Sequence, residues 1–140
     1  MQLKAKRYAI GMITTLFVFI FSFSAFAMDA PTIRLLLKSG IFDLQIGIQE
    51  GNYEVIANNL PAGTLQAGDT IAFKKDGLTV QVTVNGEKWE NLSLPVLLKA
   101  DSGEDIFSYS NTKYKGSFTL LNASSGLNVV NTVDIEDYLL

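Results

Sequence analysis

Residues 70–84 read TIAFKKDGLTVQVTV, and this stretch decides the fold class. Apolar and polar side chains alternate over 70–75 and again over 78–84, which is the period of a strand with one buried face. Asp76-Gly77 stands between the two runs and is typical of a type I′ turn, whose residues need positive φ angles. The stretch therefore predicts a β-hairpin, and Asn85-Gly86 predicts another turn directly after it.

Further strands are expected upstream of this hairpin. Residues 33–38 and 44–48 both have strand patterns, and the second alternates strictly. Glu50-Gly51-Asn52 has turn chemistry, so we expect 44–48 and 53–57 to form a hairpin across it. Residues 58–69 contain one Pro and two Gly and predict a loop.

Residues 92–99 are apolar but include Pro95. Proline has no amide hydrogen to donate to a sheet, so this run predicts an edge strand or a bulge. Taken together, the sequence predicts a mainly β fold of short antiparallel strands and hairpins, arranged as a sandwich or a small barrel. A helix is expected to begin near the C-terminus, after a separate signal helix at the N-terminus.

The first 27 residues predict a secretory signal peptide. A basic start, MQLKAKR, precedes an uncharged and mostly apolar run, and Ala25 and Ala27 form the small–large–small pattern of a cleavage site. The alternative is an uncleaved anchor, because the uncharged run over 8–27 is about long enough to span a bilayer. We expect an exported, extracytoplasmic protein, in the cell wall or a periplasm-like space, that contacts a membrane only through this segment.

The charge of the remaining chain excludes some classes of partner. Three of the 11 basic residues lie in the first 27, so 8 basic and 14 acidic residues remain, a formal charge of −6. Nucleic-acid binding needs a basic surface, and it is therefore not expected. The composition change at 100–103 is the best candidate boundary, which predicts a β-rich region over 28–100 and a second region over 101–140.

The chain contains no His and no Cys. This excludes Ser-His-Asp and Cys-His catalysis and the zinc sites that need imidazole or thiolate ligands. Asp101, Glu104 and Asp105 cluster around Gly103, but their spacing is not that of a calcium loop, so we expect a solvated acidic turn. No metal, cofactor or catalytic residue is assigned.

Trp89 is the only Trp in the chain. An exposed Trp can stack on a sugar ring, whereas the plainer interpretation is an aromatic side chain in the core or at its rim. Both interpretations stay open from the sequence, and the second is favoured.

The last 27 residues, YKGSFTLLNASSGLNVVNTVDIEDYLL, predict a strand over 114–121, a turn, a second strand over 127–130 and a helix start. Asp134 is the expected N-cap of that helix. Glu136 and Asp137 suit its first turn, where carboxylates favour the positive end of the helix dipole. This placement explains them better than an acid–base pair does, because adjacent helix positions point in different directions.

These residues resemble the first part of the SpoIID/LytB domain, the family of stage II sporulation protein D and the amidase enhancers. The resemblance has three elements in order: an aromatic–basic–Gly–Ser element, a Val-Val-Asn strand end and a Glu-Asp-Tyr-Leu helix start. The motif residues are Tyr114, Gly116, Ser117, Val129, Val130, Asn131, Glu136, Asp137, Tyr138 and Leu139. Asp134 stands where relatives often have Pro, and either residue suits a helix start.

The resemblance implies an exported cell-wall protein with a role in cutting peptidoglycan glycan strands or in enhancing a cell-wall amidase. Sporulation is the implied setting for one branch of the family. The family's acid–base Glu is expected only after the Tyr-Leu pair, past Leu140, so no catalytic residue is carried over and this chain is expected to be inactive alone. The alternative is a non-catalytic exported β-module that binds the cell wall or a partner protein.

Overall fold

A computed structural model describes residues 31–136, and the other residues lie outside the described part. The predicted signal segment with Ala25 and Ala27 therefore lies outside it, as do Asp137, Tyr138 and Leu139. Between residues 31 and 136 the structure has no helix that is long and apolar enough to cross a membrane.

The described residues are mainly β, as predicted. The strands are β1 Thr32–Ile41, β2 Asp43–Glu50, β3 Asn52–Ala57, β4 Leu60–Gln66, β5 Thr70–Asp76, β6 Thr79–Val84, β7 Glu87–Lys88, β8 Leu92–Ser93, β9 Val96–Ala100, β10 Ile106–Tyr109, β11 Thr112–Lys115, β12 Ser117–Ala123 and β13 Gly126–Asp134. Helical backbone begins at Ile135, directly after the predicted N-cap Asp134.

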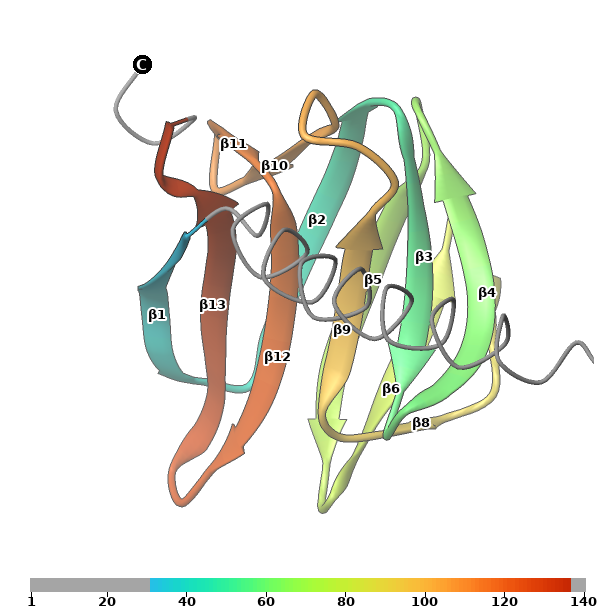
Figure 1. The fold of residues 1–140 in the computed structure, drawn as a ribbon. Coiled ribbons are helices and arrows are strands. Elements are labelled where there is room, and N and C mark those ends of the chain that lie inside the picture. Colours follow the sequence, from blue (N-terminus) through green and yellow to red (C-terminus); the bar gives the residue numbers. More distant parts are fainter. Residues whose placement is uncertain (1–30, 137–140) are drawn as a thin grey trace, which may run out of the picture. The chain divides into compact units, whose positions relative to one another are not determined.

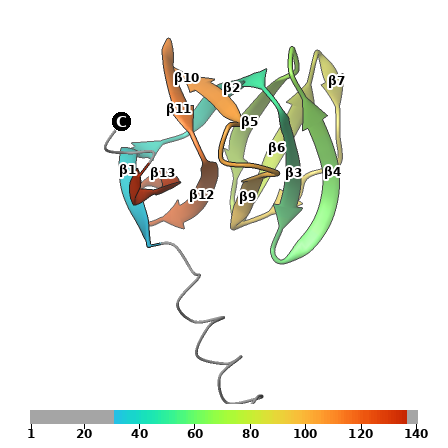
Figure 2. The ribbon, with the colours of Figure 1, turned by 45° about the horizontal axis from the view of Figure 1, so that its top comes forward.

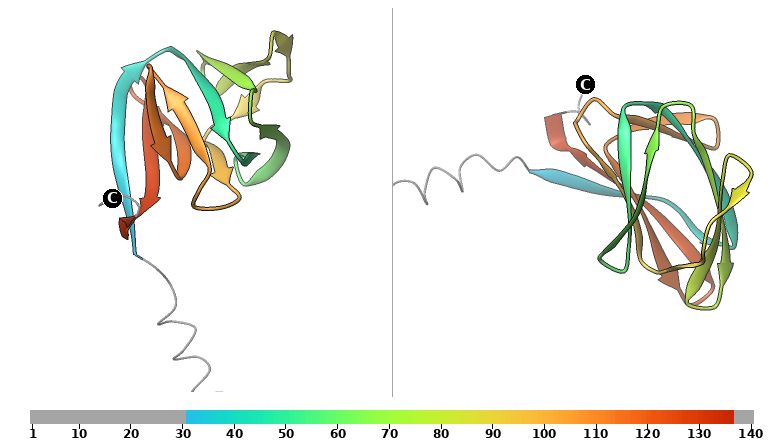
Figure 3. Two further views of the ribbon diagram at one scale, coloured as in Figure 1. Left: turned by 90° about the horizontal axis from the view of Figure 1, so that it is seen from above. Right: turned by 90° about the vertical axis from the view of Figure 1, so that its right-hand side faces the viewer.

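The strands form two antiparallel sheets (Figure 1). The first sheet has the order β1-β13-β12-β9-β3-β4. The second has the order β11-β10-β2-β5-β6-β7, and β8 also pairs with β6. Figure 3 shows the two sheets as separate layers in its right-hand view.

Apolar side chains from both sheets fill the space between the two layers. In β2 and β6, for example, alternate residues point inward, which is the two-residue period that the sequence shows. Phe107 and Phe73 of the second sheet both contact Phe118 of the first, at 5.5 Å and 6.4 Å between ring centroids. These aromatic contacts join the layers into one core.

The hairpin over 70–84 is confirmed, but its turn differs from the prediction. Asp76 pairs with Thr79, so Gly77 and Leu78 are the two turn residues. Gly77 has φ 66°, and Asp76 does not have a positive φ. A type I′ turn would need positive φ angles at both turn residues, and Leu78 has none. The turn therefore lies one residue later than predicted and is not of type I′.

The predicted hairpin of 44–48 with 53–57 was wrong. β2 pairs with β5 and β10 in the second sheet, whereas β3 pairs with β4 and β9 in the first. The chain changes sheet at Gly51, where φ is 84°. Turn chemistry alone does not distinguish a hairpin from a crossing between layers, because both need the same sharp change of direction.

The predicted loop over 58–69 is largely strand β4. Asn58 and Asn59 both have positive φ angles, 50° and 68°, and Ala57 pairs with Leu60 across them. This is the geometry of a two-residue type I′ turn. Pro61 lies in β4, and this strand is the last one of its sheet, where a missing amide hydrogen is tolerated.

The prediction of an edge strand or a bulge over 92–99 was right only for its start, where β8 pairs with β6 alone, and wrong for the remainder. Pro95 separates two strands that belong to different sheets. β9 follows it and lies inside the first sheet, between β12 and β3. The Pro therefore interrupts the run between strands, where no ladder hydrogen bond is lost.

Strands from both sides of residue 100 alternate within the sheets. β9 pairs with β12, and β10 pairs with β2. Residues 32–136 belong to one compact unit. The two regions that the sequence predicted on either side of residue 100 are parts of this one unit in the described structure.

Candidate functional site

Two elements of the predicted motif meet at Gly116, where the chain passes from β11 in the second sheet to β12 in the first. Gly116 has φ 91°, and a Cβ atom placed on it would collide with the carbonyl oxygen of Thr132 in β13. Only glycine fits, because the backbone conformation and the close approach both exclude a side chain. The glycine of the motif is therefore explained by the crossing between the sheets.

Asn131 holds this crossing from the neighbouring strand. Its Nδ2 donates hydrogen bonds to the carbonyl oxygens of Lys115 at 2.9 Å and Ser117 at 3.0 Å. These two residues flank Gly116, and the Asn131 side chain is buried. One amide group thus satisfies two backbone acceptors at the point where they leave the sheet ladder.

Tyr53 reaches the same crossing from β3. Its phenol donates a 2.8 Å hydrogen bond to the carbonyl oxygen of Gly116. Burial, and to a smaller extent the nearby charge of Asp105, raises the pKa of Tyr53 well above its usual value. The phenol therefore stays protonated and acts as a donor at neutral pH.

The other motif residues also have structural positions. Ser117 Oγ accepts a hydrogen bond from the amide of Ala100 at 3.0 Å, and the ring of Tyr114 stacks on Phe107 at 5.4 Å between centroids. Val129 and Val130 are buried. Glu136 is exposed at the end of the described residues, and nothing in them places a second carboxylate beside it as an acid–base pair.

A hollow of about 290 Å³ adjoins the crossing. Gly116 and Ser117 line it together with the end of β13 and the β9–β10 connection. The carboxylates of Asp101 and Asp134 are also among its lining residues, and both are exposed. Sequence reasoning missed this hollow, because residue 100 was expected to be a boundary between regions.

The acidic residues after β9, Asp101, Glu104 and Asp105, lie in a turn. All three were predicted to be solvated, and for Asp105 that prediction was wrong. Asp105 is buried, and its Oδ2 accepts hydrogen bonds from the amides of Asp101 at 2.8 Å and Ser102 at 3.0 Å. The carboxylate also fills the space beside Gly51, where a Cβ would collide with it. Asp105 is therefore a turn residue. Within residues 31–136, no group of three or more acidic side chains converges on a metal position.

Asp69 has a perturbed carboxyl group outside the core. Hydrogen bonds from the amide of Gln66 at 2.8 Å and from Asn85 Nδ2 at 2.9 Å lower its pKa below the usual value. A carboxyl that is held ionised by turn amides is poorly suited to donate a proton. Asp69 thus connects the β4–β5 and β6–β7 turns and is not a candidate general acid.

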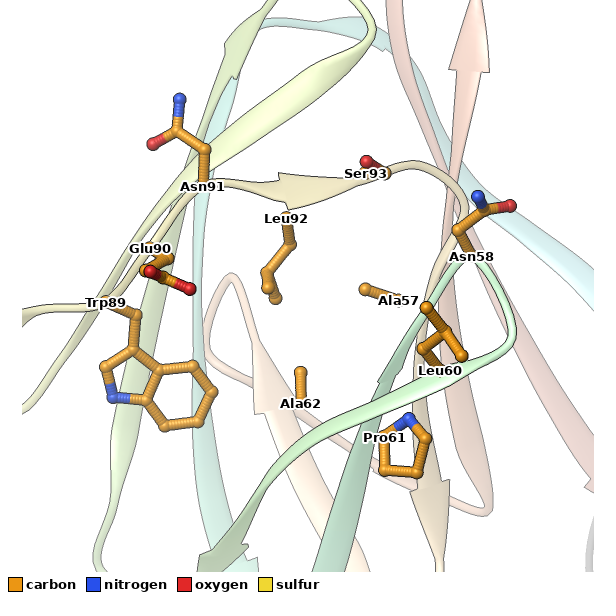
Figure 4. Close-up of a pocket in the computed structure, with 10 residues that line it drawn as sticks. All are labelled: Ala57, Asn58, Leu60, Pro61, Ala62, Trp89, Glu90, Asn91, Leu92 and Ser93. Carbon is orange, nitrogen blue, oxygen red and sulfur yellow. The ribbon is translucent and has the colours of Figure 1, made fainter.

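A groove of about 480 Å³ lies between β4 and the segment 89–93 (Figure 4). Its lining residues are Ala57, Asn58, Leu60, Pro61, Ala62, Trp89, Glu90, Asn91, Leu92 and Ser93. Trp89 is half-buried and packs against the core, and it also faces the groove (Figure 4). The structure therefore combines the two interpretations of Trp89, since the side chain is both a rim aromatic and a lining residue.

Comparison of the chain with protein-family models, with curated proteins and with solved structures gives no match.

Proposed function

We propose that this chain is an exported protein that acts at the bacterial cell wall as part of a SpoIID/LytB-like protein. Its implied role is glycan-strand cleavage in peptidoglycan or enhancement of a cell-wall amidase. The observation that supports this proposal is the crossing at Gly116. Two separate elements of the motif, at the open end of the β12–β13 hairpin, meet there, since Asn131 bonds the backbone on both sides of Gly116. A motif whose residues depend on one another in space is stronger support than the same letters in order.

The described residues themselves are proposed to bind and not to cut. No His or Cys is present, and the carboxylates with assigned hydrogen bonds, such as Asp69 and Asp105, serve turns. Hydrolysis of a glycosidic bond commonly uses two carboxyl groups in different protonation states on either side of the bond. The second candidate function, a non-catalytic β-module, is favoured for this part of the chain by the use of those carboxylates in turns.

The test uses the chain that begins at Met28, incubated with purified peptidoglycan sacculi. We expect it to sediment with the sacculi and to release no soluble glycan by itself. Addition of a cell-wall amidase distinguishes enhancement, which would raise the rate of sacculus solubilisation, from simple binding. Complete recovery of the chain in the supernatant, with no effect on the amidase, would contradict the cell-wall proposal.

Export has a separate test. N-terminal sequencing of the protein from the extracytoplasmic fraction should give a start at Met28, one residue after Ala27. A protein that retains residues 1–27 would support the anchor instead. Recovery of the chain from the cytoplasm alone would contradict export.

A further inference from the structure

The groove beside Trp89 lies where both sheets end. β4 is the last strand of the first sheet, and β7 and β8 lie along the outer edge of β6 in the second. Figure 2 shows β4 and β7 on the same side of the unit, opposite to β1. Among the described residues, no strand covers this opening between the layers, so an extended ligand can reach the groove from solvent.

Trp89 is fixed in place before any ligand binds. Its backbone amide donates a 2.9 Å hydrogen bond to the carbonyl oxygen of Val82. Its six-membered ring lies against Gly63, where an added Cβ would be only 2.6 Å from the ring. A ring that is already ordered loses little conformational entropy on binding. Because Gly63 has no side chain, the indole ring of Trp89 can occupy this position.

The polar groups of the groove suit a neutral ligand that is rich in hydroxyls. The Glu90 carboxylate is directed into the groove beside Trp89, and Asn58, Asn91 and Ser93 stand at the rim (Figure 4). No basic side chain lines the groove, so a phosphate or another anion would meet only the charge of Glu90. Carboxylate oxygens accept hydrogen bonds, whereas the rim amides both donate and accept them.

We propose that this groove binds a pyranose ring of a neutral glycan. The apolar C–H face of the sugar packs on the Trp89 indole, and its hydroxyl groups bond to Glu90 and to the rim amides. The volume of about 480 Å³ falls in the range of small-molecule clefts. The inference rests on the proposed function only in taking cell-wall glycan as the source of the sugar.

A cationic side chain would also interact with an aromatic ring beside a carboxylate. The sugar is favoured because a cation has no use for the amide donor of Asn58, whereas a ring with several hydroxyls does. The two ligands also differ in their response to salt. Attraction between a cation and Glu90 weakens as salt screens it, and hydrogen bonding and stacking of a neutral ring change little.

The experiment uses the chain from Met28 and a β-1,4-linked N-acetylglucosamine tetramer as the probe. Trp89 is the only Trp, so a change of tryptophan fluorescence on titration reports this groove directly. We expect saturable binding that is unchanged by 0.5 M NaCl. Trp89→Ala should weaken binding at least tenfold, measured by calorimetry, Trp89→Tyr should retain part of it, and Glu90→Gln should weaken it severalfold.

The control is Glu87→Gln, which removes an exposed carboxylate of β7 outside the groove and should leave affinity unchanged. Urea unfolding of each variant separates a lost site from a lost fold. Because Trp89 packs against the core, the Tyr and Glu90→Gln variants carry the test if Trp89→Ala does not fold. Binding that disappears in salt, or that a Lys-rich peptide displaces, would overturn the sugar assignment.

A sacculus pull-down distinguishes this inference from the proposed function. If the wild-type chain sediments with sacculi and the Trp89 variants sediment equally, the groove inference fails and the cell-wall proposal stands. If the chain binds the tetramer through Trp89 but stays in the supernatant with sacculi, the groove inference stands and the cell-wall proposal fails.

Discussion

The phenol oxygen of Tyr53 lies 2.8 Å from the carbonyl oxygen of Gly116 and donates a hydrogen bond to it. Tyr53 belongs to β3, and Gly116 is the residue at which the chain leaves β11 for β12. The two residues are 63 positions apart in sequence. The bond therefore ties the C-terminal crossing to a strand of the N-terminal half, and it gives the first prediction.

Tyr53→Phe should lower the free energy of unfolding by about 1 to 2 kcal/mol, because the Gly116 carbonyl loses its donor while the ring volume is kept. Urea denaturation measures this change. Tyr109→Phe is the matched control, since no hydrogen bond of the Tyr109 phenol is found in the described residues and its removal should cost less. Equal losses for the two variants would contradict the role of the Tyr53 phenol.

The same phenol predicts a loss of stability at alkaline pH. Burial and the charge of Asp105 raise the pKa of Tyr53 in the folded chain above the usual value of 10.0. The unfolded chain therefore loses the proton first, so this stabilisation is complete below pH 10 and declines as the pH rises above it. Urea unfolding between pH 8 and 11 should show a steeper decline for wild type than for Tyr53→Phe, and parallel curves would refute the assignment.

Gly116→Ala should destabilise the fold by at least about 3 kcal/mol, since the new Cβ would collide with Thr132 in a backbone conformation that already disfavours alanine. Gly68→Ala is the matched control. Gly68 has φ 97°, and nothing lies within 4 Å of its added Cβ, so it should cost only about 1 kcal/mol. Thermal unfolding of both variants tests whether glycine is required at position 116 by the close contact with Thr132 or by the positive φ angle alone.

Asn131→Asp should destabilise the fold by about 2 to 4 kcal/mol at neutral pH, because it replaces two donated hydrogen bonds with a carboxylate facing two carbonyl oxygens. Part of the loss should be recovered at low pH, where the protonated carboxyl regains one donor. Asn122→Asp on the same hairpin changes an exposed residue and serves as the control. Equal changes in the free energy of unfolding for the two variants would contradict the role of Asn131 at the crossing.

Lys75 connects the two sheets at the opposite end of the same hairpin. Its Nζ donates hydrogen bonds of 3.1 Å to the carbonyl oxygens of Ala123 and Gly126 in the β12–β13 turn. Lys75→Met should speed amide hydrogen exchange in this turn and leave β2 and β5 protected. Lys74→Met, an exposed neighbour, is the control and should change neither region.

The local elements of the fold could be predicted from the sequence where one face of a strand is buried. The alternation over residues 78–84 is such a case, and β6 forms there. The pairing partners could not be predicted in the same way. Gly51 and Gly116 are both turn residues by composition, and in the structure both carry the chain from one sheet to the other. Whether a turn returns to its own sheet is decided by contacts between layers.

The candidate site could likewise be predicted only in part. Trp89 was noticed because it is the only Trp, and its stacking on a sugar was weighed from the sequence. The groove is lined in part by Asn58. Asn58 was expected in a loop, because the hairpin turn at Asn58-Asn59 was not recognised from the sequence. The burial of Asp105 was missed, because three carboxylates close together in sequence are typical of a solvated turn. In the structure Asp105 is buried by the close approach of Gly51, which the local sequence does not indicate.

The pairing of β1 with β13 places Thr32 opposite Asp134, at the same end of an antiparallel pair. A mechanical force applied between these two residues would separate the strands one pair at a time, because it acts across the ladder and not along it. Such unzipping needs less force than sliding two strands past each other. Pulled in this direction, the unit would yield first at β1, and the remaining strands of the first sheet would stay together until higher force.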